Sequence, residues 1–281
     1  MAESAAILCS AEQTVVMPAG DAPCPMAAMV DVDGLRYAWE HLEGLWSKGG
    51  LVPLVYQNSG ASVKAFCGSY GGAVCTSSNA AAAIRWGLEQ SGHVLFVPDR
   101  YLATNSALSL GYPMERIALW SRTEDTLKAA ADPQDLVLVA WDGYCSVHRR
   151  FTLEDVLLIR REHPGIQVIV HPECIPEVVQ ASDAAGSTSY IVAAVEKAPS
   201  GSQFAIGTEV HLVERLAKEN PDKMVIPLKR SPCVSMGRTD IYNLCYTLEH
   251  LAAGHPVNVI AVDPEIAEQA RAALQRMLEI K

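Results

Sequence analysis

Short apolar runs along this chain each stop at a cluster of polar or cysteine residues. Seven such runs are Leu51–Val55, Ala73–Val74, Val94–Val97, Leu136–Ala140, Val168–Val170, Ala184–Ala185 and Phe204–Ile206. Buried strands of parallel sheets are apolar on both faces, so these runs indicate strands. Because ligands of parallel α/β folds bind beyond the carboxyl ends of strands, the polar clusters predict one site where several strand ends meet. An enzyme is the leading interpretation.

Segments with helical spacing and capping residues separate the apolar runs. Asn79 is a suitable N-cap for a helix over Ala80–Leu88, and Thr152 with Asp155 forms a pattern typical of a capping box. The remaining predicted helices cover residues 2–9, 33–47, 60–67, 209–219 and 265–280. Alternating strands and helices predict an α/β fold in which helices cover both faces of parallel sheets.

Length and charge narrow the class of protein. The 281 residues allow two domains of ~150 residues or three smaller ones. A net charge of −10 without a basic cluster argues against a nucleic-acid partner. No apolar stretch approaches the ~18–20 residues of a membrane helix, and Met1–Ser4 lacks the features of a signal peptide. We therefore expect a cytoplasmic protein with no membrane partner.

Eight cysteines lie far apart in the sequence and form no Cys-x-x-Cys pair, which gives no support to a zinc ribbon or a redox pair. Cys24, Cys145 and Cys233 each lie in a loop beside proline or glycine, in three different blocks of the chain. Thiolates are preferred ligands of iron–sulfur clusters, and three of them on a four-iron cluster leave one iron open. From spacing alone, another choice of three is possible, and most cysteines of this kind are small buried apolar side chains.

Two short motifs carry groups suited to proton transfer or metal binding. His171-Pro172-Glu173-Cys174 puts an imidazole near a carboxylate at a strand end, although the same segment is equally a capped strand end with a buried cysteine. Cys145 and His148 form a Cys-x-x-His pair, but no second pair supports a zinc site. His148 is therefore interpreted as a structural residue at a strand–helix junction.

Hydroxyl and amide side chains follow other predicted strands. Ser187 and Thr188 precede an apolar helix-like stretch, and Ser77 lies in a similar polar segment. Such positions can hold a carboxylate or phosphate, although simple N-capping explains each one in isolation. Tyr56 and Asn58 alternate along a strand end and share one face, where they either orient a substrate or satisfy buried backbone groups.

The order of these motifs along the chain is specific. The segments concerned are Tyr56–Ser59, Cys75–Ala80, Pro98–Leu102, Trp141–His148, His171–Cys174, Gly186–Thr188, Ile206–Glu209 and the loops that begin at Cys24 and Cys233. Together they resemble quinolinate synthase, the oxygen-sensitive iron–sulfur enzyme of de novo NAD biosynthesis. The resemblance covers essentially the whole chain. It implies condensation of iminoaspartate with dihydroxyacetone phosphate to quinolinate, with loss of water and phosphate.

The resemblance also implies a fold and a set of site residues. The fold is α/β, with three-layer αβα domains and parallel sheets in pseudo-threefold symmetry around a [4Fe–4S] cluster that acts as a Lewis acid. The implied metal ligands are Cys24, Cys145 and Cys233, and Cys174 would be only a neighbour. The implied catalytic residues are His171, Glu173 and Tyr56. The implied substrate-binding residues are Tyr56, Asn58, Ser77, His171, Glu173, Ser187 and Thr188.

The chain departs from the family in two places. Motifs that precede the equivalent of Met1–Ser4 in the family are not matched, so the chain looks N-terminally shortened and its first domain incomplete. Residues 103–140 are longer than the family needs. We predict a partial first domain over 1–32, a second domain over 33–147, a third over 148–245, and a C-terminal segment over 246–281 that packs back on the first.

Two alternatives to a working enzyme follow from these departures. One is a truncated, catalytically impaired remnant that at most binds a cluster or a phosphorylated metabolite. The other is a metal-free α/β protein that binds a phosphorylated metabolite. For the enzyme itself, the resemblance implies small-molecule substrates and a source of iminoaspartate, either L-aspartate oxidase or aspartate dehydrogenase.

Overall fold

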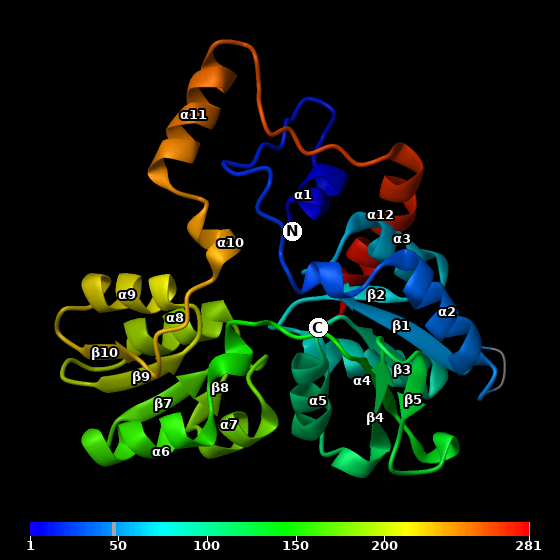
Figure 1. Ribbon diagram of the computed structural model, residues 1–281, viewed down its shortest axis with the longest axis horizontal. Helices are drawn as coiled ribbons and strands as arrows, with labels where there is room; N and C mark the ends of the chain where they lie inside the picture. The colour runs from blue at the N-terminus through cyan, green and yellow to red at the C-terminus, as the bar shows by residue number, and fades with distance from the viewer. Residues whose placement is uncertain (47–48, 281) are drawn as a thin grey trace.

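The computed structural model describes residues 1–46 and 49–280, and it consists of two α/β units with additional segments from both ends of the chain (Figure 1). The first unit contains a six-stranded sheet in the order β2-β1-β3-β6-β4-β5. All neighbouring strands are parallel except the edge pair β4 and β5. Its strands are β1 (Leu51–Tyr56), β2 (Ala73–Cys75), β3 (His93–Val97), β4 (Ile117–Ser121), β5 (Thr126–Lys128) and β6 (Leu138–Trp141).

Helices cover both faces of this sheet because its central strands are apolar on both sides. Val55, Leu95 and Val97 face the core formed with α2 (Val32–Glu43), α3 (Ala61–Ser69) and α12 (Pro264–Glu279). Leu54 and Phe96 face the opposite core, formed with α4 (Ala80–Ser91) and α5 (Arg100–Ser109). Successive residues of a strand therefore enter different cores, as a three-layer arrangement requires.

The second unit repeats this construction on a smaller scale. Its four parallel strands lie in the order β10-β9-β7-β8. Val168 and Val170 face the core under α6 and α7, whereas Ile169 faces α8 and α9. The elements are β7 (Gln167–Val170), β8 (Ala184–Ala185), β9 (Gln203–Gly207), β10 (Met224–Pro227), α6 (Leu153–Glu162), α7 (Pro176–Ala181), α8 (Thr188–Lys197) and α9 (Val210–Glu219).

The remaining elements belong to neither sheet. Helix α11 stands apart from both sheets in Figure 1, and α1 lies beside the C-terminal segment. Within the described residues, the N-terminal and C-terminal segments pair with each other through one isolated antiparallel bridge between Val16 and Val259. The elements are α1 (Ala2–Leu8), α10 (Val234–Gly237), α11 (Ile241–Ala252) and the short 3-10 helices η1 (Ala27–Met29), η2 (Met114–Arg116), η3 (Pro133–Asp135) and η4 (His148–Arg150).

The predicted α/β class with parallel sheets in three-layer units is confirmed, whereas the pseudo-threefold symmetry and the domain boundaries stay predictions. The helix expected over 33–47 ends at Glu43, before Gly44, and residue 47 lies outside the described residues. Helix α12 packs mainly against α3 and β2 and makes a smaller contact with α1. The enlarged segment 103–140 contains the end of α5 and supplies β4 and β5. Among the described residues, no helix is both long and apolar enough to cross a membrane.

Candidate active site

The strand ends of both sheets meet around Glu173. Tyr56 is the last residue of β1, Asp99 follows β3, and His171 directly follows β7. Tyr56 and Glu173 lie close enough for each to shift the pKa of the other, so the ends of the two sheets come together here. Asn105 of α5 makes a second link, because its side-chain amide donates to the carbonyl oxygens of Pro172 and Cys174, both at 2.7 Å. The turn that carries His171 and Glu173 is thus fixed from the other unit.

Glu173 is the centre of a buried polar network. Its Oε2 lies 2.7 Å from Nδ1 of His148, and Nε2 of His148 lies 3.1 Å from Oγ1 of Thr208. The rings of His148 and His171 stack at a centroid distance of 4.3 Å. His171 Nδ1 accepts from the backbone N–H of Glu173 at 3.3 Å. Only 2 % of Glu173 and 4 % of His171 are exposed, so these groups act in an environment of low dielectric.

The network fixes the protonation of its members. Burial alone would raise the pKa of Glu173, but the neighbouring His171 and His148 and the hydrogen bonds from His148 and Tyr56 lower it to about 2. Burial and the charge of His148 lower the pKa of His171 to about 4. Burial and the charge of Glu173 raise the pKa of Tyr56 well above its ordinary value. At neutral pH the site therefore presents a carboxylate, a neutral imidazole and a phenol that keeps its proton.

Asp99 lies on the first sheet's side of the network and is completely buried. Its Oδ1 accepts from Leu102 N at 2.7 Å and its Oδ2 from Cys145 N at 3.0 Å. Burial and the charge of Glu173 raise the pKa of Asp99, and the backbone N–H donors oppose that rise.

The three cysteines expected to bind metal are free thiols, and Cys24 and Cys145 lie close enough to Glu173 for its charge to act on them. Cys24 is an exposed residue, but partial desolvation of its thiol, followed by the charges of Glu173 and Cys233, raises its pKa. Burial and the charge of Glu173 also raise the pKa of Cys145. Backbone N–H groups oppose this rise in pKa, those of Ala27 and Met26 at Cys24 and those of His148 and Val147 at Cys145. These thiols keep their protons until a cation replaces them, as metal-binding thiols do.

A second possible metal ligand set overlaps the first. The ligand atoms of Cys145, His148 and Glu173 all lie within 4.8 Å of one another. Both ring nitrogens of His148 already have partners in Glu173 and Thr208, so His148 would have to release one of them to bind an ion. The chain therefore has a possible metal site next to Glu173, with Cys145 common to both ligand sets.

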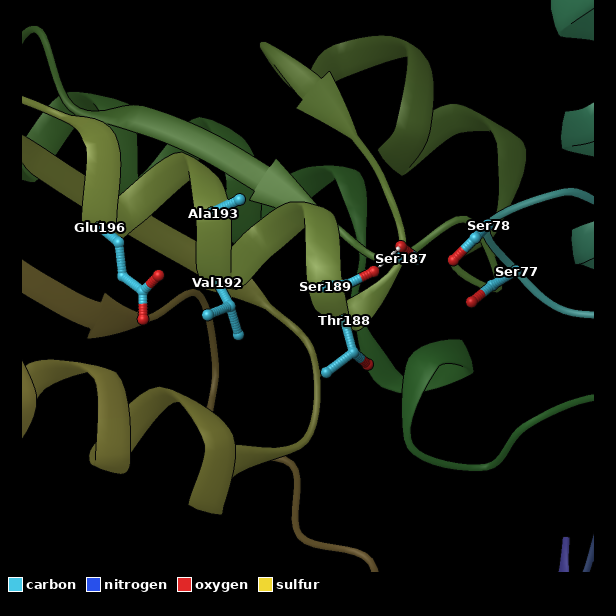
Figure 2. Close-up of a pocket in the computed structure, with 8 residues that line it drawn as sticks. All are labelled: Ser77, Ser78, Ser187, Thr188, Ser189, Val192, Ala193 and Glu196. Atoms are coloured by element: carbon cyan, nitrogen blue, oxygen red, sulfur yellow. Dashed lines mark hydrogen bonds between the residues drawn. The ribbon is translucent and has the colours of Figure 1, made fainter. Parts of the chain in front are cut away.

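A pocket of about 530 Å³ opens between the two units (Figure 2). Ser77 and Ser78, from the loop after β2, face the N-terminal turn of α8 across this pocket, and Ser187, Thr188 and Ser189 line the α8 side. Ser187 also caps α8, since its Oγ accepts from Tyr190 N at 3.3 Å. Ser77 lies close enough to Tyr56 to lower its pKa, so the pocket borders the Glu173 network. Hydroxyl groups and a helix N-terminus together suit an anionic ligand.

The sequence-predicted residues divide into two groups in the structure. Tyr56, His171 and Glu173 lie in the buried network, whereas Ser77, Ser187 and Thr188 line the pocket. Asn58 is half-buried beyond the end of β1, and no hydrogen bond to it is found within residues 1–46 and 49–280. Their roles in catalysis and binding stay predictions.

Sequence reasoning missed three members of the site. His148 had a structural interpretation, yet it is the nearest partner of Glu173. Asp99 had no assigned role, and Thr208 was expected only to cap the helix over 209–219, whereas Glu209 is the N-cap of α9. The available signal was position, because Asp99 and Thr208 each lie two residues after an apolar run, Val94–Val97 and Phe204–Ile206, which become β3 and β9. No local pattern indicates that these loops meet.

Comparisons with known proteins identify the family. A family model described as quinolinate synthetase A protein matches residues 1–279. Proteins named quinolinate synthase from Bacillus anthracis (strain A0248), Bacillus cereus (strain AH187) and Bacillus thuringiensis subsp. konkukian (strain 97-27) are each 44 % identical to this chain. Each alignment covers 99 % of this chain and 76 % of the relative. The chain therefore belongs to the quinolinate synthetase A family of enzymes, as its motifs predict.

Proposed function

We propose that this chain is a quinolinate synthase that condenses iminoaspartate with dihydroxyacetone phosphate and releases water and phosphate. The observation that carries the proposal is the buried Glu173 network, in which Tyr56 from one sheet meets His171 and His148 from the other side of the site. Ring formation from these substrates requires several proton transfers. The carboxylate supplies one acceptor for them, and the neutral imidazole, through its protonated Nε2, and the phenol supply two donors.

We propose that Cys24, Cys145 and Cys233 hold a [4Fe–4S] cluster beside this network. The donor set fits such a group, because it offers three free thiols and because backbone N–H groups favour the thiolate forms of Cys24 and Cys145. A bound cluster would supply a Lewis acid for dehydration at an iron without a protein ligand. The ionised Glu173, which has a carboxylate oxygen within 4.8 Å of the Cys145 sulfur, would orient a hydroxyl group that is to leave.

The residues in and around the network would bind and orient the substrates. His171 is neutral and its Nδ1 accepts from Glu173 N, so Nε2 carries the proton and would donate a hydrogen bond to a substrate carbonyl or imine. Tyr56 keeps its proton and would donate a hydrogen bond to substrate oxygen, and Asn58 would orient the same substrate. Ser77, Ser187 and Thr188 would hold phosphate or carboxylate groups in the pocket.

The chemistry of the substrates suggests the partners. Iminoaspartate hydrolyses readily, so an enzyme that makes it by oxidising aspartate, L-aspartate oxidase or aspartate dehydrogenase, would act alongside this one in NAD biosynthesis. Eight free cysteines suit a reducing compartment, and we propose the cytoplasm. No nucleic-acid or membrane partner is proposed. The impaired-remnant alternative is not favoured, because the family match spans residues 1–279.

Anaerobic assay of the purified chain tests the proposal. We expect iron-loaded protein with broad absorbance near ~400 nm to form quinolinate from both substrates together and from neither alone. Protein exposed to air serves as the control and should lose both absorbance and activity. An iron-loaded chain that forms no quinolinate would favour the remnant, and a chain that takes up no iron would favour the metal-free alternative.

A further inference from the structure

Two loops that carry predicted cluster ligands are held by the same arrangement of hydrogen bonds, once in each sheet. Cys145 lies in the loop after β6, beside β3, and Cys233 lies in the loop after β10, beside β9. In each case a buried acidic residue at the end of the neighbouring strand caps the next helix. These residues are Asp99 before α5 and Glu209 before α9.

Each acidic side chain uses its two oxygens for two different tasks. Asp99 Oδ1 accepts from Leu102 N in the first turn of α5, while Oδ2 accepts from Cys145 N at 3.0 Å. Glu209 Oε2 accepts from His211 N in the first turn of α9, while Oε1 accepts from Cys233 N at 3.1 Å. The cap of a helix and the backbone of a cysteine thus share one carboxyl group.

A backbone hydrogen bond closes each arrangement from the opposite side. Arg100 N, one residue after Asp99, donates to the carbonyl of Gly143 at 2.9 Å. Val210 N, one residue after Glu209, donates to the carbonyl of Ser231 at 3.2 Å. Both acceptors lie two residues before the cysteine, so the two hydrogen-bond pairs are equivalent.

The first loop pair also requires a glycine. A Cβ atom on Gly143 would lie 2.4 Å from the carbonyl oxygen of Pro98, so only glycine allows the loops after β3 and β6 to approach this closely. Other acidic caps in the described part of the chain do not reach a second loop. Asp240 and Asp263 are exposed and accept only from the first turns of their own helices.

We infer that Asp99 and Glu209 are positioning residues that hold the backbones of Cys145 and Cys233 in place for metal ligation. This inference rests on the proposed function, since it concerns how the ligands of that metal site are held. A carboxyl group suits the task because both of its oxygens can accept a hydrogen bond. An amide has one acceptor oxygen, so Asn or Gln can serve either the helix or the cysteine, not both.

Isosteric amide variants test the inference. We would compare D99N, E209Q and D263N with the unchanged chain, measuring iron per chain after anaerobic reconstitution and hydrogen exchange in the metal-free protein. D263N is the matched control, because it alters an acidic cap that touches no cysteine loop. Circular dichroism reports whether each variant folds.

The expected effect is local and reciprocal. In D99N, backbone exchange should rise about tenfold in the peptide that contains Cys145 and stay unchanged in the peptide that contains Cys233. In E209Q the pattern should reverse, and both variants should retain less iron than the unchanged chain and D263N. Because the two residues lie in different sheets, E209Q still provides the test if D99N fails to fold.

Two outcomes overturn the inference, and they are distinguishable. Iron retention and exchange equal to the unchanged chain in both variants would overturn the positioning role alone. An unchanged chain that takes up no iron would overturn the proposed function and the inference together.

Discussion

The buried centre around Glu173 and the outer segment around α11 are stabilised in different ways. At the centre, Glu173 and His171 are almost completely buried and held by hydrogen bonds that cross between sheets. In α11, Tyr242 is 82 % and Ile241 63 % exposed, although the helix is apolar in composition. Both regions contain polar and aromatic side chains. Those at the centre are buried and held by hydrogen bonds, whereas those of α11 face solvent. The two regions therefore differ in how deeply their side chains are buried more than in residue type.

The largest expected effect comes from removing a predicted ligand at the centre. Cys145→Ser should abolish iron retention after anaerobic reconstitution, because serine is a poor ligand for an iron–sulfur cluster. Cys67→Ser is the matched control, since Cys67 is buried and donates to the carbonyls of Pro53 and Ala73, which a hydroxyl can also do. Equal iron content in the two variants would contradict our choice of ligands.

Glu173→Gln should lower the rate of quinolinate formation by about 10²–10⁴-fold, the usual contribution of a positioned acid–base group. The amide keeps the shape of the side chain but cannot act as a proton acceptor between His148 and Tyr56. The measurement is kcat under anaerobic conditions with both substrates saturating. A rate within threefold of the unchanged chain, a range of about 0.7 kcal/mol, would remove Glu173 from the chemistry.

As the pH falls, the free energy of unfolding should decrease because of His171 before Glu173 becomes protonated. The pKa of His171 is about 4 in the folded chain against an ordinary value of 6.5, so the unfolded chain binds the extra proton between these values. The free energy of unfolding should therefore fall by about 3 kcal/mol as the pH drops from 6.5 to 4. The contribution of Glu173 is present above pH 4.5 and is lost only as the pH falls towards 2.

Urea unfolding at several pH values measures this dependence. His171→Asn removes the titrating group and should flatten the profile between pH 4 and 6.5. An identical profile in the variant would show that another group is responsible.

The smallest effect is expected in the outer segment. Tyr242→Ala should change the free energy of unfolding by less than about 0.5 kcal/mol, because the side chain is mostly exposed. Leu54→Ala, in the completely buried β1, should cost about 2–5 kcal/mol. Denaturant unfolding of both variants compares the two regions directly. A large effect at Tyr242 would mean that α11 is covered by a partner in solution.

Local sequence patterns determined the elements of this fold and one pair at its site. The apolar runs specified the strands because a strand buried on both faces must be apolar throughout. Capping residues located the helices, as with Thr152 and Asp155, which form the predicted capping box. His171 and Glu173 could be paired from sequence because a single turn joins them.

Tertiary structure decided which strand ends meet. The hydrogen bonds from Glu173 to His148 and from Asp99 to Cys145, and the proximity of Glu173 to Tyr56, join loops far apart in the chain. The spacing of residues along the sequence does not predict such contacts, because they depend on strand order and on how two separate sheets face each other. The same limit applied to residues 103–140, where β4 and β5 extend the first sheet. The sequence by itself therefore determined the chemical groups and the strands that carry them, while the packing of the two sheets determined which groups act together.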